Sequence, residues 1–310
     1  MVRGRKFKAG VPVRVLGLED EGYPRGLRDL DTAPKRVYLA GAWDHPGPFV
    51  AVVGSRTATE DGLDVARYLA RSLAIRGIAV VSGLARGIDA AAHEGALDGG
   101  GPSGAVLGTA VDEIYPREHA SLQLALARSL GLMSEIGPGQ SATRGTFATR
   151  NRLLAAIADV VVVVQGRAGS GSLITADEAF GLRRPVGAMP WDPREPLGEA
   201  PHELIRAGKA TLVRNAEEVV KLIGRGRGGA RHASAAAPSR AVSTIEAEGL
   251  PPHEAALYRA LRERPLSLDR LAAAAELSAP ELTVALLALE LNGLAQRAPG
   301  GLARRTRRAP

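Results

Sequence analysis

Short apolar runs alternate with amphipathic stretches along the chain from Phe49 onward. The run Val50–Val53 has the length of a strand and no polar position, whereas Asp61–Arg76 repeats its apolar residues with helical spacing. Buried strands separated by helices are typical of an α/β fold, in which a mostly parallel sheet is covered on both faces. The expected strands are Val50–Val53, Ile78–Val81, Gly104–Leu107, Leu132–Met133, Val160–Val164, Pro185–Ala188 and Thr211–Val213, and the expected helices are Asp61–Arg76, Gly87–Leu97, Arg117–Leu130, Thr149–Ala158 and Ile174–Leu182.

Changes in composition divide the chain into segments. Residues 1–48 form a basic arm and a lead-in with one extra strand expected at Val37–Leu39, and residues 49–223 form the large domain. Residues 224–249 are rich in Gly, Ala, Ser and Arg without apolar periodicity, which predicts a flexible linker. Residues 250–310 recover helical patterns and end in a basic tail. Three helices and a hairpin, typical of a winged-helix domain, are expected there, at Glu254–Arg262, Leu266–Ala275, Ser278–Leu291 and Leu294–Arg305.

Composition limits the partners and the compartment. The formal charge is +7, and arginine supplies most of the positive charge. A basic balance favours polyanionic partners, although a GC-rich genome would also enrich arginine over lysine. Cysteine is absent, which excludes disulfides and thiolate zinc sites. No apolar run follows the basic N-terminus, and Val160–Val164 is too short to span a bilayer, so we expect a cytoplasmic protein without membrane contact.

The loops that follow the strands are the candidate ligand sites, because ligands of such sheets bind beyond the carboxyl ends of the strands. The first loop is Gly54-Ser55-Arg56, where a glycine would admit a phosphate and the next two residues add a donor and a charge. A packing role for Gly54 is the alternative. In the second loop, Ser82–Asp89, two glycines bracket Arg86 before a helix begins. His93, one helical turn after Asp89, is interpreted as a structural histidine in preference to a ligand contact.

Two further motifs suit a phosphate or a base. Phe147–Arg152 places two arginines around an asparagine at an expected helix start, which favours a clamp on phosphate and base over an exposed charged helix end. Gly169–Thr175 combines glycines and hydroxyls between a strand and a helix, which favours close approach of a ligand over a simple capped turn.

Motifs of several enzyme classes are missing from the sequence. It has no GxxxxGK[ST], no GxSxG and no HExxH, and its histidines are scattered without metal-ligand spacing. Gly99–Gly104 matches GxGxxG by letter but precedes an expected strand, so it is not a dinucleotide fingerprint. The acidic residues show no two-metal cluster. We therefore expect a binding protein with no catalytic residues, no metal and no cofactor.

Six segments occur in an order that resembles one family. They are VAVVGSRTAT, VVSGLARGIDAAAHEGAL, AVLGTAVDEIYPREH, SEIGPG, TFATRNRLLA and SGSLITADEA, and together they resemble the DNA-processing protein A (DprA/Smf) family. The resemblance implies an extended Rossmann-like fold that binds single-stranded DNA, forms a homodimer and loads the RecA recombinase during natural transformation. The DNA site that we expect from motifs and resemblance together consists of Gly54, Ser55, Arg56, Ser82, Gly83, Arg86, Phe147, Arg150, Asn151, Arg152, Ser170, Gly171, Ser172 and Thr175.

The chain departs from the family pattern at a few positions. Ala148 stands where a proline is common, Gln165 where a glutamate is common, and Trp191 where a glycine is usual. Because Gln165 replaces a carboxylate, any acidic role at that position is in doubt.

Three functions are compatible with the sequence. The first is a single-stranded DNA-binding mediator that protects incoming DNA and loads RecA. The second is a sensor or hydrolase of a nucleotide or ribose-phosphate, as in other members of the superfamily. The third is a duplex-binding regulator acting through the winged helix, which we disfavour because Glu281 and Glu290 make its third helix a poor DNA reader. We expect that domain to be an accessory or protein-contact module.

Overall fold

The computed structural model describes residues 10–223, 251–261, 266–291, 294–298 and 302–305. The chain divides into two compact units, residues 1–232 and 233–310, and each is described by itself. The basic arm before residue 10, the linker expected at 224–249, the turn of the C-terminal hairpin and the basic tail lie outside the described residues.

The larger unit contains one nine-stranded sheet, with the order β1-β2-β6-β5-β4-β3-β7-β8-β9. Seven strands run parallel, and β2 pairs antiparallel with β6 and with β1. The expectation of a mostly parallel α/β sheet is therefore confirmed. The strands are β1 (Val13–Gly17), β2 (Arg36–Ala40), β3 (Phe49–Val53), β4 (Ala79–Ser82), β5 (Ser103–Leu107), β6 (Gly131–Ser134), β7 (Val160–Val163), β8 (Val186–Ala188) and β9 (Thr211–Leu212).

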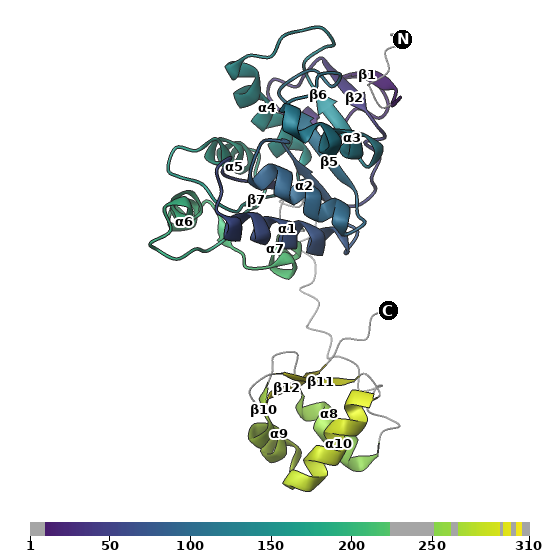
Figure 1. Cartoon of the computed structure of the whole chain (residues 1–310), viewed down its shortest axis with the longest axis vertical. Coiled ribbons are helices and arrows are strands. Elements are labelled where there is room, and N and C mark those ends of the chain that lie inside the picture. The colour runs from purple at the N-terminus through teal and green to yellow at the C-terminus, as the bar shows by residue number, and fades with distance from the viewer. Residues whose placement is uncertain (1–9, 224–250, 262–265, 292–293, 299–301, 306–310) are drawn as a thin grey trace. The chain divides into compact units, whose positions relative to one another are not determined.

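Helices cover both faces of this sheet (Figure 1). Side chains alternate along each strand, so that Val50 and Val52 of β3 pack with one helical layer, whereas Ala51 and Val53 pack with the other. The first layer, with α3 over the β5–β6 part of the sheet, contains α1 (Glu60–Ala74), α2 (Ile88–Asp98), α3 (Ala120–Arg128) and α7 (Ala216–Ile223). The second layer contains the 3-10 helix η1 (Arg25–Asp29), α4 (Arg144–Ile157), α5 (Gly171–Gly181) and α6 (Glu199–Arg206).

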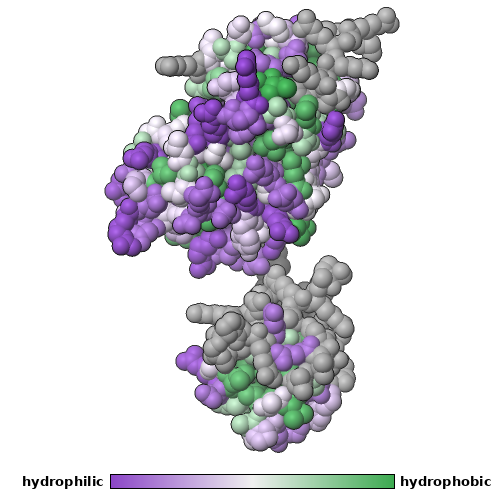
Figure 2. Space-filling model, in the orientation of Figure 1, coloured by the Kyte–Doolittle hydropathy of each residue, from purple (hydrophilic) through white to green (hydrophobic). Residues whose placement is uncertain are grey.

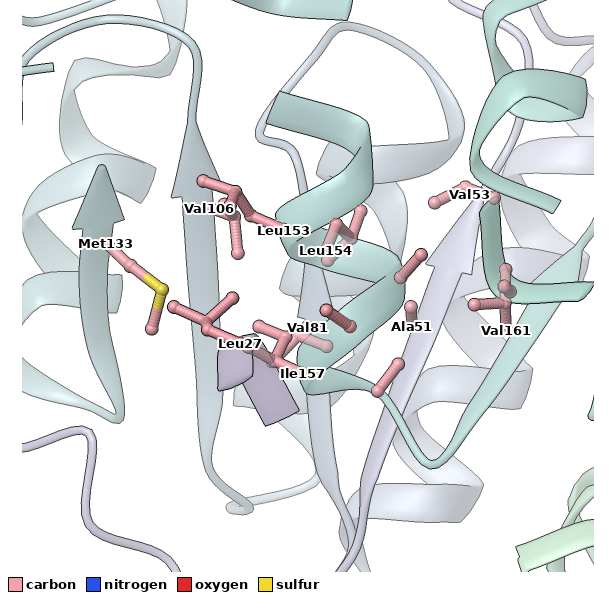
Figure 3. Close-up of a cluster of buried hydrophobic side chains, with 14 of the residues drawn as sticks. Leu27, Ala51, Val53, Val81, Val106, Met133, Leu153, Leu154, Ile157 and Val161 are labelled. Carbon is pink, nitrogen blue, oxygen red and sulfur yellow. The ribbon is translucent and has the colours of Figure 1, made fainter. Parts of the chain in front are cut away.

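Helix α4 forms the centre of the second layer (Figure 3). Its Leu153, Leu154 and Ile157 are almost completely buried against strands β3 to β7. Burying an aliphatic side chain of this size stabilises a fold by about 1.5–3 kcal/mol. Tight packing along α4 therefore fixes the position of the polar residues that the same helix carries toward the carboxyl edge of the sheet.

Several elements differ from those expected. Helix α4 begins at Arg144, five residues before the expected start, because Thr143 and Thr146 form a reciprocal capping box. Helix α5 begins at Gly171 instead of Ile174. Helix α3 is shorter than expected because Arg117–His119 form a separate 3-10 turn, η2. Strand β1 and the eight-residue helices α6 and α7 were not expected, since such short segments carry little periodicity.

The smaller unit is a winged helix, as expected. Helices α8 (Pro252–Ala260), α9 (Leu268–Ala275) and α10 (Ala279–Leu291) pack around a core that includes Leu257, Leu271 and Leu286. Its sheet has the order β10-β12-β11, with strands β10 (Leu266–Ser267), β11 (Ala295–Ala298) and β12 (Leu302–Arg305).

Hydrophilic residues predominate over α1 and α6 on the face of the larger unit shown in Figure 2. Helices α1 and α2 are joined on the surface by the ion pair of Arg67 and Glu94, at 3.2 Å. Among the described residues, no single helix is both long and apolar enough to cross a membrane; α9 and α10 pass such a test only when joined as a bent pair.

Candidate nucleic-acid interface

A cleft of about 480 Å³ lies beyond the carboxyl ends of β3 and β7. Strand β3 is followed in sequence by its neighbour β4 on one side, and its other neighbour, β7, comes later in the chain. The order of connection therefore reverses between β3 and β7, and ligands of α/β sheets bind at such a switch point. The loops are held together there because the Ser55 N–H donates to the carbonyl of Gln165 at 2.7 Å.

Ten of the fourteen residues expected in a DNA site line this cleft. They come from the loop after β3, from α4, and from the loop and helix after β7, and they are Gly54, Ser55, Arg56, Phe147, Arg150, Asn151, Ser170, Gly171, Ser172 and Thr175. Segments more than a hundred residues apart in sequence thus converge at one edge of the sheet.

Arg56 and Arg167 form the rim of the cleft. Arg56 follows β3, Arg167 follows β7, and both side chains are exposed. Neither makes a hydrogen bond or an ion pair through its side chain within the part of the chain that the structure describes. Two unpaired guanidinium groups at one opening favour an anion that accepts forked hydrogen bonds, such as phosphate.

Helix α5 adds backbone donors to the same opening. Its N-cap, Ser170, makes no side-chain capping bond, and its hydroxyl instead lies 2.8 Å from that of Ser172. The Asn151 amide of α4 donates to the carbonyl of Gly171 at 3.3 Å and so ties α5 to the core helix. The start of an α-helix carries free N–H groups and a partial positive charge, both of which stabilise an anion.

Arg150 lies in the floor of the cleft instead of at its rim. Its side chain is only 6% exposed, and it donates to the carbonyl of Val106 at 2.5 Å. A methyl group on Gly83 would lie 1.8 Å from this guanidinium, so the glycine makes room for the arginine. Burial lowers the pKa of Arg150, while the charge of Asp89 raises it. Arg150 is therefore a buried structural cation in addition to a cleft-lining residue.

Asp89 is the acidic group of the floor. It is buried in the first turn of α2 and accepts hydrogen bonds from the N–H groups of Gly83, at 3.1 Å, and Ala85, at 3.4 Å. Burial raises the pKa of Asp89, against the opposing effects of the Arg150 charge and of these hydrogen bonds. The carboxylate thereby organises the loop between β4 and α2.

His93, one helical turn after Asp89 in α2, is completely buried. Its Nδ1 is 2.9 Å from the hydroxyl of Ser103, and its Nε2 has no partner among the described residues. Burial and the charge of Arg150 lower the pKa of His93 to about 3, so the ring is neutral near pH 7. The interpretation of His93 as a structural histidine agrees with this environment.

Four expected residues lie outside the lining of this cleft. The Ser82 hydroxyl is buried and donates to the carbonyl of Val52 at 2.6 Å, and Gly83 packs against Arg150. Arg86 forms an ion pair with Glu118 on the neighbouring surface. Arg152 points away from the cleft, where it pairs with Glu135 at 2.6 Å and donates to the carbonyl of Thr32. The clamp expected from two arginines around Asn151 is therefore not formed as a unit.

Gly54 is required for packing. A methyl group there would lie 2.7 Å from both the carbonyl oxygen of Gln165 and the Ile88 side chain. This agrees with the packing role that was the alternative to phosphate binding.

Gln165 and Trp191, which depart from the family pattern, have structural partners. Gln165 is buried, and its amide both accepts from the N–H of Thr59, at 3.1 Å, and donates to the hydroxyl of Thr59, at 2.9 Å. A carboxylate would provide only the accepting half of this pair. The Trp191 indole donates to the carbonyl of Val164 at 2.6 Å. Ala148 lines the cleft and is exposed.

Arg167 was not among the expected site residues. The sequence places Arg167 in the loop after the Val160–Val164 run, which is one of the loops expected to bind a ligand. In the structure, the pairing of β3 with β7 puts this loop and Arg56 in the same cleft. Within the described parts of both units, no group of three or more His, Asp or Glu side chains could hold a metal ion.

Phe147 forms the aromatic wall of the cleft. It is half-buried in the second turn of α4, and its ring centroid lies 5.2 Å from that of Tyr115. An aromatic face beside unpaired cations is the combination with which proteins hold single-stranded nucleic acid.

The sequence matches the models of known protein families over most of its length. Residues 14–224 match the family model of DNA recombination-mediator protein A, and residues 237–301 match that of the DprA winged helix domain. The chain is similar to Protein Smf of Synechocystis sp., with 30% identity over 91% of this chain and 77% of the relative.

Two solved structures are similar to this chain. DNA processing protein A of Streptococcus pneumoniae aligns with a TM-score of 0.64 and 34% identity over 68% of this chain and 74% of that one. DNA processing protein A of Helicobacter pylori, whose structure concerns its single-stranded DNA binding mode, aligns with a TM-score of 0.62 and 28% identity over 69% of this chain and 97% of that one.

Proposed function

Because this chain belongs to the DNA recombination-mediator protein A family, we propose that it is a recombination mediator that binds single-stranded DNA in the cleft beyond β3 and β7. The observation that carries the proposal is the pair of exposed arginines, Arg56 and Arg167, which have no side-chain partner among the described residues and line the same cleft as the N-terminus of α5. The single-stranded DNA binding mode of the related Helicobacter pylori protein supports it.

In this account the strand binds through one phosphate and one base. The phosphate lies between the rim arginines and the first N–H groups of α5, with the hydroxyls of Ser170 and Ser172 nearby. The base lies against the ring of Phe147, where stacking does not depend on its identity. The fourteen expected residues then divide into ten that line the cleft and four that support or flank it, and Arg167 joins the first group.

The cleft favours a single strand over a duplex. A base inside a duplex is stacked and paired, so its face is not available to Phe147, whereas a single strand exposes its bases. Sequence preference should be weak, because the cleft offers phosphate contacts and an aromatic face in place of a set of base-edge readers.

The finer role that we propose is protection of incoming single strands and loading of RecA during natural transformation, by a homodimer in the cytoplasm. The recombination-mediator description of the matching family supports this role. Its test is whether the protein speeds RecA filament formation on strands that are already covered by a single-strand-binding protein.

A titration of fluorescent oligo-dT tests the proposed ligand. Unlabelled oligo-dT should displace it at far lower concentration than a duplex of equal length or dTMP does. Binding should weaken steeply with salt, because phosphate contacts release counterions. A protein that ignores oligo-dT but binds or hydrolyses mononucleotides would instead be the nucleotide sensor or hydrolase, a role that the cleft's volume of about 480 Å³ also accommodates.

A further inference from the structure

A second groove adjoins the cleft, and Phe147 lines both. This groove has a volume of about 1390 Å³ and lies between the loop after β5 and the segment that leads into α4. A ligand that passes Phe147 in the cleft therefore enters this groove without leaving the surface.

Tyr115 is the exposed aromatic residue of the groove. Its side chain is 49% exposed, and its ring is tilted by 50° to that of Phe147. The other large aromatic side chains that are strongly exposed among the described residues, Tyr68 and Phe180, line neither hollow.

The backbone around Tyr115 is held in place from beneath. Its N–H donates to the side-chain oxygen of Gln123 at 3.2 Å, and Gln123 is completely buried. The amide nitrogen of Gln123 donates to the carbonyl of Glu113 at 2.8 Å. A ring on an anchored backbone loses less conformational freedom on binding than one on a mobile loop.

The charges of the groove differ from those of the cleft. Two arginines and three acidic residues line it, and one arginine, Arg86, is engaged by Glu118. The groove therefore has no excess of positive charge with which to attract a phosphate. Its attraction for a nucleic acid would come from the face of Tyr115, and stacking on an aromatic ring adds little salt dependence.

We propose that this groove is a second nucleotide subsite, in which the base next to the one at Phe147 stacks on Tyr115. The inference rests on the proposed function and assigns different contacts with the strand to the cleft and to the groove. The cleft binds phosphate through charge, and the groove binds a base through stacking. An apolar segment of a partner protein is the competing occupant of the groove.

The test compares Tyr115→Ala and Tyr115→Phe in the full chain, with oligo-dT as the probe over a series of salt concentrations. Tyr115→Ala should weaken binding about 5- to 30-fold, the effect of about 1–2 kcal/mol for one stacked base. The slope of log K against log salt should not change, and Tyr115→Phe should bind like the unchanged protein. Tyr68→Ala, which removes an exposed tyrosine from α1, is the matched control and should have no effect.

A second readout reports the stacking itself. An oligo-dT that carries one 2-aminopurine should lose fluorescence on binding to the unchanged protein and to Tyr115→Phe, and should lose less on binding to Tyr115→Ala. Melting curves of the variants should coincide, because Tyr115 is exposed.

Three outcomes can be told apart. If Tyr115→Ala binds oligo-dT like the unchanged protein, the groove is not a nucleotide subsite, and a segment of a partner protein becomes its expected ligand. If Tyr115→Ala lowers the salt slope as the loss of a phosphate contact would, stacking is wrong as the cause. If the unchanged protein does not bind oligo-dT at all, the proposed function itself fails.

Discussion

The rim and the floor of the cleft use the same side chain for opposite purposes. At the rim, Arg56 and Arg167 are exposed and have no partner within the described residues. In the floor, Arg150 is 6% exposed, bound to the carbonyl of Val106 and electrostatically coupled to Asp89. An arginine in a ligand-facing motif is therefore not by itself a ligand contact, because burial and partners decide whether its charge serves the ligand or the fold.

The difference predicts separate consequences for the two regions. Substitutions in the floor should change stability, because they leave buried polar groups without partners. Substitutions at the rim should change affinity and its salt dependence while leaving stability unchanged.

The largest effect is expected for Arg150→Met. The variant loses the hydrogen bond to Val106 and leaves the buried Asp89 without its nearby cation, so the free energy of unfolding should fall by about 3 kcal/mol. Urea denaturation of the full chain measures this change. Arg56→Met is the matched control, because it removes an exposed arginine from the same cleft, and should remain within about 0.5 kcal/mol of the unchanged protein. Equal losses in the two variants would abolish the distinction between rim and floor.

A somewhat smaller loss of stability is expected from the titration of His93 as the pH falls. The pKa of His93 is lowered to about 3 in the folded protein, whereas that of an unfolded histidine is about 6.5. The unfolded state therefore binds a proton more readily, and stability is lost as the pH falls below about 6.5 until it levels off near the folded pKa. Between pH 7 and pH 5 this group should cost about 2 kcal/mol.

His93→Gln removes the titrating group and retains a hydrogen-bonding side chain for Ser103. Urea denaturation at both pH values should show a smaller loss between pH 7 and pH 5 for this variant than for the unchanged protein. The same loss in both proteins would mean that His93 is not a buried neutral base.

The smallest effect on binding is expected in the winged helix, where one face of α10 is exposed but lacks the positive charge of the rim. Helix α10 contains no lysine or arginine, and its exposed residues include Glu281, Thr283 and Val284. Because a major-groove reader needs cations and donors, Thr283→Ala with Val284→Ala should change oligo-dT and duplex binding by no more than about twofold. A tenfold loss of duplex binding would show that exposed residues of α10 bind DNA even without a basic side chain.

The fold follows from local sequence signals to a large extent. Apolar runs such as Val160–Val164 identify buried strands, and the parallel topology then places the loops after them at one edge. The winged helix was also predictable from local signals. Its helix starts carry capping residues such as Ser267, whose hydroxyl accepts a hydrogen bond from the N–H of Arg270. Strand β1 and the short helices α6 and α7 fall below the length at which periodicity is informative.

The site was predictable only in outline. The motif around Phe147 marks α4 as a ligand-facing helix, yet residues two positions apart on a helix face different sides, so Arg150 and Arg152 do not point at one ligand. Arg152 therefore reaches Glu135, and Arg150 enters the space that Gly83 leaves. Arg167 escaped prediction because a lone arginine in the loop after β7 forms no local pattern, whereas the glycines and hydroxyls of Gly169–Thr175 in the same loop do.

The central claim is that the rim arginines hold the phosphate of a single strand. The most direct measurement is the affinity of Arg56→Ala with Arg167→Ala for oligo-dT over a series of salt concentrations. The control is Arg76→Ala, which removes an exposed arginine just after the C-terminal end of α1. The double variant should bind about 10- to 100-fold more weakly, with a log–log salt slope about 0.7 smaller because the contact with one phosphate is lost, and with an unchanged melting temperature. A double variant with the affinity and slope of the Arg76→Ala control would contradict the account.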